Sequence, residues 1–393
     1  MNGDLDATVL SDTGYYYLRD FATTGDAIRI KLPYIDPSKE FPEYIWIENH
    51  NGKNMNGVEF DQWQYQDAAC VTPLVYGLYM YLQIDKDVRQ SASLNDVNGG
   101  HANYLRPITA EGFYDREYDT TLQKLACVGS YDVRPFIRPP DKQNPLTGCG
   151  DQEWYMVDGN NNNLLEAYDG LGNDIENVEG NYESHLFWNG HSRHAFTLSG
   201  NKKLGIGTNP SSASMMNMVG KDWPPPADAK NLRKVYLNGI SVEITEQFSD
   251  GGIVVRIRFD DIDVANDVRW CADSIVLNPV KTSSGYSLNL KKGKTITIDQ
   301  GLTGTRMNNP QIINGNKVFA SPTVFTCLAN SYFHLESKAK VILDNESKLF
   351  LKPGSKLEIE KGARLVLQKG SSLVVEEGAQ LIIRKGGKVI KKK

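Results

Sequence analysis

The sequence contains no long apolar run and has a net negative charge, and its first residues do not predict a signal peptide. No stretch approaches the roughly 20 apolar residues that a transmembrane helix needs, so no transmembrane segment is expected. A net charge of -5 over 393 residues argues against a nucleic-acid-binding protein, which typically carries a basic patch. The first residues, MNGDLDATVL, lack the basic and apolar start of a signal peptide.

The common catalytic and metal-binding motifs are also missing. None of the five cysteines has CxxC spacing, which argues against a zinc ribbon or a redox pair. Cys127 and Cys149 flank a proline-rich loop and could pair in an oxidising compartment, whereas Cys327 is expected to be a small buried residue. The six histidines form no HExxH motif, and neither a GxSxG elbow nor a glycine-rich phosphate loop is present. No catalytic residue can be named from this sequence.

Amphipathic helices of useful length are absent, and the chain up to about residue 280 reads as short strands and loops. The runs YYYLRDF, AIRIKLPYI and YIWIENH are rich in aromatic and β-branched residues with partial alternation, which favours strands. The run TPLVYGLYMYLQID is continuous enough for a strand buried on both faces. Further strands are expected from Lys234 onward, with a hairpin at Gly251 and Gly252.

The last quarter of the chain is a repeat with a period of eight residues. From Leu349 it runs LFLKPGSK, LEIEKGAR, LVLQKGSS, LVVEEGAQ, LIIRKGGK, with apolar residues at the first and third positions and glycine at the sixth. The same register extends back to Phe325 and Cys327, and it appears again at Leu288 and Ile296. Residues i and i+2 of a strand share one face, and glycine at a corner tolerates positive φ. The repeat therefore predicts short strands joined by sharp corners.

Two architectures fit this pattern. Three units would make one coil of about 24 residues in a β-solenoid. An antiparallel meander with three-residue loops would also keep the inward parity, but it would leave one apolar face of a single sheet bare. The solenoid is therefore preferred. Leu365 and Leu373 are expected to point inward, with Arg364, Gln368 and Glu376 outside and Gly370 at a corner.

Two acidic segments are candidate cation sites. Asp158, Asn160, Asn162 and Asp169 occupy positions 1, 3, 5 and 12 of a pattern that resembles a calcium loop. Position 6 lacks the usual glycine, so an ordinary asparagine-rich loop competes with calcium, the one cofactor considered for this chain. The run from Asp260 to Asp267 joins two strands and is interpreted as a solvated turn, with ion binding as the alternative.

The loops between residues 150 and 200 contain two further groups of candidate residues. Glu183, His185, His191 and His194 lie close in sequence, but their spacing matches no common zinc site. Aromatic residues flank the same loops and suggest a platform for a sugar or peptide, or else part of a sandwich core. The candidate ligand-binding residues are Trp154, Tyr155, Tyr182 and Trp188.

Several strand phrases resemble a known family. The series AIRIKLPYI, EYIWIENHN, VYGLYMYLQID, HAFTLSGNKKLGIGTNPSS, VYLNGISVEIT and GIVVRIRF resembles the region after the catalytic domain in immune-inhibitor-A-like secreted metallopeptidases of Bacteroidetes. The repeat resembles the carboxyl-terminal part of such secreted proteins. This resemblance implies an extracellular or cell-surface location and a catalytic domain that this chain lacks. Without HExxH, no catalytic residue transfers to this sequence.

The sequence thus predicts an all-β chain, with one or two β-sandwich or barrel-like domains followed by a β-solenoid of eight-residue units. The expected ranges are 1–110, a β-rich domain resembling the region after a peptidase domain, 111–280, a loop-rich sandwich, and 281–393, the solenoid. The leading functional hypothesis is a non-catalytic accessory and stalk region of a secreted metallopeptidase-like protein, with a positioning role or a protein or glycan ligand. The alternatives are a surface adhesin or phage-fibre-like glycan-binding module, and a β-helix enzyme acting on polysaccharide, which would need paired carboxylates on a solenoid face.

Overall fold

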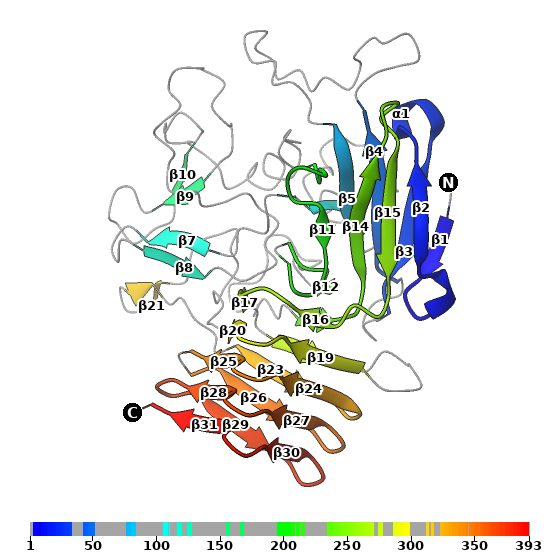
Figure 1. The fold of residues 1–393 in the computed structure, drawn as a ribbon. Helices are drawn as coiled ribbons and strands as arrows, with labels where there is room; N and C mark the ends of the chain where they lie inside the picture. Colours follow the sequence, from blue (N-terminus) through cyan, green and yellow to red (C-terminus); the bar gives the residue numbers. More distant parts are fainter. Residues whose placement is uncertain are drawn as a thin grey trace.

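In the computed structural model, the regular secondary structure of the described residues is almost wholly strand (Figure 1). Its helical segments, η1 (Leu10–Asp12) and α1 (Phe21–Thr24), are short, and no helix among the described residues is long and apolar enough to cross a bilayer. The described residues are 3–33, 42–51, 76–83, 105–108, 110, 116–119, 124–127, 155–157, 166–168, 195–208, 210–212, 214–216, 234–270, 274–277, 286–298, 312–313, 316–317, 323–344 and 346–392.

Two sheets form a β-sandwich in the amino-terminal body (Figure 1). The first has the order β1-β3-β4-β5-β6, in which β1 runs parallel to β3 and the other pairs are antiparallel. The second is antiparallel throughout and has the order β11-β14-β15-β2. Their strands are β1 (Gly3–Asp6), β3 (Ala27–Lys31), β4 (Tyr44–His50), β5 (Gly77–Gln83), β6 (Leu105–Ile108), β11 (Lys203–Leu204), β14 (Ser241–Gln247), β15 (Ile253–Arg258) and β2 (Gly14–Leu18). One sandwich thus takes strands from both of the ranges 1–110 and 111–280.

Alternating side chains explain why these segments pair as a sandwich. In β4 the isoleucines Ile45 and Ile47 are buried while their neighbours are half-buried. Strand β15 alternates in the same way, burying Ile253, Val255 and Ile257. Because the buried residues of both sheets belong to one continuous hydrophobic core, the alternation fixes which face of each sheet points inward.

The carboxyl-terminal body is a β-solenoid, in which each coil contributes one strand to each of three sheets (Figure 1). Two stacks have the orders β16-β19-β24-β27-β30 and β17-β20-β25-β28-β31, and the third runs β13-β18-β23-β26-β29 with β12 added antiparallel to β13. The strands are β12 (Ser214–Met216), β13 (Lys234–Leu237), β16 (Asp263–Val264), β17 (Val268–Trp270), β18 (Ser274–Leu277), β19 (Tyr286–Leu290), β20 (Thr295–Ile298), β23 (Val324–Cys327), β24 (Ser331–Leu335), β25 (Lys340–Leu343), β26 (Lys348–Leu351), β27 (Lys356–Ile359), β28 (Arg364–Leu367), β29 (Ser372–Val375), β30 (Gln380–Ile383) and β31 (Lys388–Lys391).

The register of these stacks excludes the meander. Leu349 pairs with Leu373, and Leu365 pairs with Val389, in parallel and 24 positions apart (373 − 349 and 389 − 365). Three eight-residue units therefore make one coil, as the repeat predicts. The all-β class and the solenoid are confirmed. Leu365 is fully buried, and Arg364 on the same strand is exposed.

The corners of the solenoid repeat one turn geometry. The sixth residue of each described unit has φ between 59° and 91°, and in the later coils it is glycine, as the sequence predicts. In the coil before these, Asn330, Lys338 and Glu346 adopt the same left-handed conformation with φ of 64°, 63° and 59°. In the units from Phe325 onward the seventh residue is also small, and it is buried in the first six of them, at Ser331, Ala339, Ser347, Ser355, Ala363 and Ser371.

The two bodies are interleaved along the chain. The solenoid begins at β13, upstream of residue 281, but the next solenoid strand is β16. Between them, β14 and β15 leave the solenoid and pair with β11 and β2 in the sandwich. The first coil is therefore interrupted by a sandwich hairpin.

The last coil has a neighbour on one side among the described residues. Strands β29, β30 and β31 pair with the preceding coil through parallel registers. The inward positions Val375 and Ile383 are 42% and 47% exposed, whereas their counterparts one coil earlier, Leu351 and Ile359, are fully buried. The ladder thus ends in a partly open rung.

Three short antiparallel hairpins lie outside these bodies. They are β7 (Arg116–Asp119) with β8 (Lys124–Cys127), β9 (Tyr155–Val157) with β10 (Glu166–Tyr168), and β21 (Ile312–Ile313) with β22 (Asn316–Lys317).

Candidate functional surfaces

Most residues predicted as a ligand or metal site lie outside the described residues. These are Asp158, Asn160, Asn162, Asp169, Trp154, Tyr182 and Trp188, together with Glu183, His185, His191 and His194. Tyr155 begins β9 and is paired in register with Tyr168 of β10. Calcium binding and the aromatic platform at residues 150–200 therefore stay predictions. Cys127 lies in β8, and Cys149 falls outside the described residues.

The acidic run from Asp260 to Asp267 forms protein contacts. Asp261 is buried, and its Oδ2 lies 2.7 Å from Nζ of Lys203. Burial would raise the pKa of the Asp261 carboxyl, but Lys203, the Ser241 hydrogen bond and the Arg258 charge together outweigh burial and lower the pKa. Asp260 pairs with Arg258 at 2.9 Å. Among the described residues, no group of three or more histidines, cysteines or acidic residues could hold a metal ion.

The outward face of the β24–β27–β30 stack contains a compact charged cluster around Glu358. The Glu358 side chain is only 9% exposed and accepts hydrogen bonds from Arg384 Nε at 2.7 Å and Tyr332 Oη at 2.9 Å. Lys356 Nζ lies 3.0 Å from the same carboxylate and 4.3 Å from the Tyr332 ring centroid. Residues that lie on three consecutive coils are thus tied together across the stack.

The contacts of this cluster shift the pKa values of Glu358 and Tyr332. Burial alone would raise the pKa of the Glu358 carboxyl, but hydrogen bonds from Arg384, Lys356 and Tyr332 outweigh burial and lower the pKa to about 2. Burial, followed by the hydrogen bond to Glu358, raises the pKa of Tyr332 to about 12. A general acid needs a proton near neutral pH, so Glu358 is unsuited to that role.

A second surface, on the sandwich, exposes three aromatic rings. Tyr15, Tyr17 and Phe248, here called the aromatic surface, are 67%, 43% and 46% exposed. The two tyrosines lie on the outward face of β2, a strand at the edge of its sheet. Phe248 follows β14 at the start of the β14–β15 hairpin. Tyr17 and Phe248 meet edge to face, with ring centroids 5.7 Å apart and planes at 73°.

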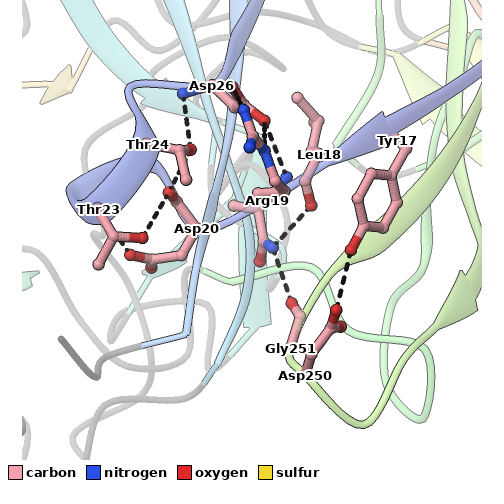
Figure 2. A network of polar contacts seen from close by, with 10 residues as sticks. Tyr17, Leu18, Arg19, Asp20, Thr23, Thr24, Asp26, Asp250 and Gly251 are labelled. Atoms are coloured by element: carbon pink, nitrogen blue, oxygen red, sulfur yellow. Dashed lines mark hydrogen bonds and ion pairs between the residues drawn. The ribbon is translucent and has the colours of Figure 1, made fainter. Parts of the chain in front are cut away.

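A network of polar contacts holds this hairpin against β2 (Figure 2). The buried Asn49 of β4 donates Nδ2 hydrogen bonds to the carbonyl of Leu18 at 3.1 Å and to that of Gly251 at 2.8 Å. Asn49 thereby links a strand of the first sheet to the edge strand and the hairpin turn of the second. The position of the hairpin relative to Tyr17 is fixed by this buried amide.

The loop after β2 is fixed by two buried carboxylates (Figure 2). Asp20 caps α1 by accepting a hydrogen bond from the backbone N–H of Thr23 at 3.0 Å. Asp26 binds the Arg19 guanidinium through both oxygens, at 2.7 and 3.0 Å. These contacts order the segment that follows Tyr17 and Leu18.

Tyr17 itself is fixed in orientation by the hairpin turn. Its Oη donates a hydrogen bond to Oδ2 of Asp250 at 3.2 Å (Figure 2). Burial, with a further contribution from the Asp250 carboxylate, raises the pKa of the Tyr17 phenol. The ring lies directly over Gly252, where an added Cβ would be 2.2 Å from the Tyr17 hydroxyl oxygen. Gly252 is therefore needed for this ring position.

Sequence reasoning missed the aromatic surface, although part of its signal was present. The run Tyr15-Tyr16-Tyr17 predicts a strand, and alternation requires that one or two of these tyrosines face outward. The neighbouring glycines at the hairpin mark a place where another group comes close to the backbone.

No family model matches this chain, and no curated protein or solved structure shows a significant similarity to it.

Proposed function

We propose that this chain is a non-catalytic accessory and stalk region that positions other parts of a secreted, metallopeptidase-like protein. The observation that supports the stalk is the continuous 24-residue register of the solenoid. Residues at the inward positions are apolar and fully buried through successive coils, as at Phe325, Leu349 and Leu365. An interior filled in this way serves packing and carries no chemistry.

The physical properties of the stack suit a spacer. Each coil hydrogen-bonds to the next through three parallel strands, and neighbouring strands lie about 4.8 Å apart. The length of such a body therefore grows in proportion to the number of coils, with little freedom to bend. The outward Glu358 cluster adds cross-coil contacts to the same stack.

The secreted setting and the metallopeptidase context are supported by the resemblance of the strand phrases to the region after the catalytic domain of immune-inhibitor-A-like enzymes. The absence of HExxH from the sequence fits an accessory region. If the reading frame on the amino-terminal side is sequenced, an in-frame HExxH helix would support this context, and a frame without one would overturn it.

The stalk is tested by lengthening it. We expect that five tandem copies of residues 349–372, inserted after residue 372, extend the maximum dimension in solution scattering by about 24 Å, because each coil adds about 4.8 Å. A glycine–serine insert of the same length serves as the control. If the chain with the inserted coils has the same maximum dimension as the flexible control, the proposed spacer role is wrong.

The non-catalytic role is tested separately. The purified chain should not cleave casein, and cleavage that a chelator abolishes would refute the non-catalytic role.

A further inference from the structure

We propose that the aromatic surface of Tyr15, Tyr17 and Phe248 binds carbohydrate. This inference goes beyond the stalk function and does not depend on it. The surface lies on the outward face of the β11-β14-β15-β2 sheet, while the inward side of β2 presents Tyr16 and Leu18 to the core. The rings are thus not needed to fill the sandwich.

The exposed rings are presented in a defined geometry. Tyr15 and Tyr17 are two residues apart on one strand, which separates them by about 7 Å. Tyr17 is fixed by Asp250, Phe248 and the bare backbone of Gly252. Aromatic side chains that are already ordered lose little conformational entropy when a ligand binds. This surface is prepared for contact before any ligand arrives.

Polar groups border the rings. Tyr15 is paired across the strands with Arg256, whose guanidinium donates to Glu243 at 2.9 Å. The Asp250 carboxylate lies beside the Tyr17 hydroxyl. A pyranose ring has an apolar C–H face and a rim of hydroxyls, so it can stack on a tyrosine while its rim meets carboxylate and guanidinium groups.

A protein partner fits this surface less well. Stable protein interfaces bury roughly 1,200 Å² or more in total and have an apolar centre. On the described part of this sheet face, the neighbours of the three rings include the charged side chains of Glu243, Asp250 and Arg256. A small apolar area inside a charged border, with two tyrosines about 7 Å apart along one strand, matches two neighbouring sugar units. We therefore assign an uncharged oligosaccharide of at least two units as the ligand class.

The test uses the full chain and affinity electrophoresis through gels with cellulose derivatives, glycol chitin, xylan, starch or β-1,3-glucan, together with an array of defined oligosaccharides. We expect retardation by at least one of these polymers. Tyr15→Ala and Tyr17→Ala should each weaken that binding at least tenfold. Tyr15→Phe, which keeps the ring, should retain most of it, and Leu198→Ala, at an exposed apolar residue elsewhere, should leave it unchanged.

Each outcome decides the proposal. Because Tyr15 is 67% exposed, its alanine variant should fold, and an unchanged melting temperature would verify this. If none of the glycans binds, or if binding persists in both tyrosine variants, the proposal is wrong. Retention by a peptide array but by no glycan, with loss in Tyr15→Ala, would instead assign the surface to an extended protein segment and overturn the carbohydrate assignment.

Discussion

At the scale of single residues, the solenoid corners show how a side chain is tolerated where glycine is preferred. Asn330, Lys338 and Glu346 have the left-handed φ that glycine has at the corners of the next coil. For a residue with a Cβ, this conformation costs roughly 1 kcal/mol or more. The corner stack compensates in part, since the backbone N–H of Asn330 donates to the carbonyl of Gly354 at 3.1 Å.

The first prediction follows from this strain. Lys338→Gly should raise the free energy of unfolding by about 0.5–1 kcal/mol, because it removes the Cβ penalty at a positive φ. Lys361→Gly is the matched control, since Lys361 is an exposed residue next to corner Gly362 but is not itself left-handed. Glycine there should lower stability. Urea denaturation of both variants gives the comparison, and equal shifts in the same direction would contradict the corner geometry.

The second prediction concerns Glu358 and acid. Its pKa is about 2 in the folded protein and about 4.3 in an unfolded chain, so the folded state binds fewer protons between these values. The resulting stability is fully present above pH 4.3 and is lost as the pH falls toward 2. Glu358→Gln should therefore flatten the dependence of the free energy of unfolding on pH in that window. A wild-type slope that persists in Glu358→Gln would show that other carboxylates cause it.

At the scale of elements, the strands of the repeat have one face that must be apolar and one that need not be. Leu365 is fully buried and lies between Val341 and Val389 of the adjacent coils. Arg364, its neighbour on the same strand, is exposed. Because the two residues are adjacent in the chain, the same substitution at each of them isolates the effect of burial on stability.

The third prediction compares these two positions. Leu365→Asp buries a carboxylate without a partner, which is costly whether the group is charged or protonated, so the solenoid should become sensitive to protease while the sandwich stays resistant. Arg364→Asp should change stability by no more than roughly 0.5 kcal/mol. Limited proteolysis with mass mapping of the fragments measures both. Equal resistance of the two variants would be inconsistent with the buried ladder.

The solenoid strands could be predicted from the sequence alone. Leu365 and Leu367 repeat the pattern of Leu357 and Ile359 with the same glycine spacing. The eight-residue period and the inward direction of the apolar side chains can therefore both be recognised in a short stretch of sequence. The small seventh residue, such as Ala363, recurs with the same period and is equally local.

The aromatic surface depends on contacts that the sequence does not encode locally. Alternation in Tyr15-Tyr16-Tyr17 allows either Tyr16 or the other two to face inward. The choice is made by pairing with β15, where Tyr16 lies opposite the buried Val255. A partner more than two hundred residues away leaves no trace in a short window of sequence.

At the scale of the whole molecule, the sandwich and the solenoid cannot be separated at one point in the chain. The hairpin β14–β15 belongs to the sandwich, yet β13 before it and β16 after it belong to the first coil. Loosening the hairpin should therefore affect the near end of the solenoid first, because each coil contacts mainly its neighbours.

The fourth prediction measures this coupling. Val255→Ala removes buried methyl groups from β15 and should cost about 2 kcal/mol. Hydrogen exchange should become faster in β15, β13 and β16, with little change in β29, β30 and β31. Val254→Ala, on the outward side of the same strand, is the control and should leave exchange nearly unchanged. A uniform acceleration across all coils would mean that the whole chain unfolds as one unit.

The partly open last rung has a mechanical consequence. A force applied on the carboxyl-terminal side of β31 first meets the coil of β29, β30 and β31, which in the described part of the chain pairs with a coil on one side. Removal of that coil leaves an equivalent coil under the same force. Each peeled coil of 24 residues would release about 80 Å of extended chain. Under tension, the solenoid should yield in repeated steps of nearly constant height, observable by single-molecule force spectroscopy, whereas a single rupture would contradict coil-by-coil peeling. Stepwise peeling would limit the force that reaches the sandwich, because the solenoid would lengthen before the sandwich unfolds.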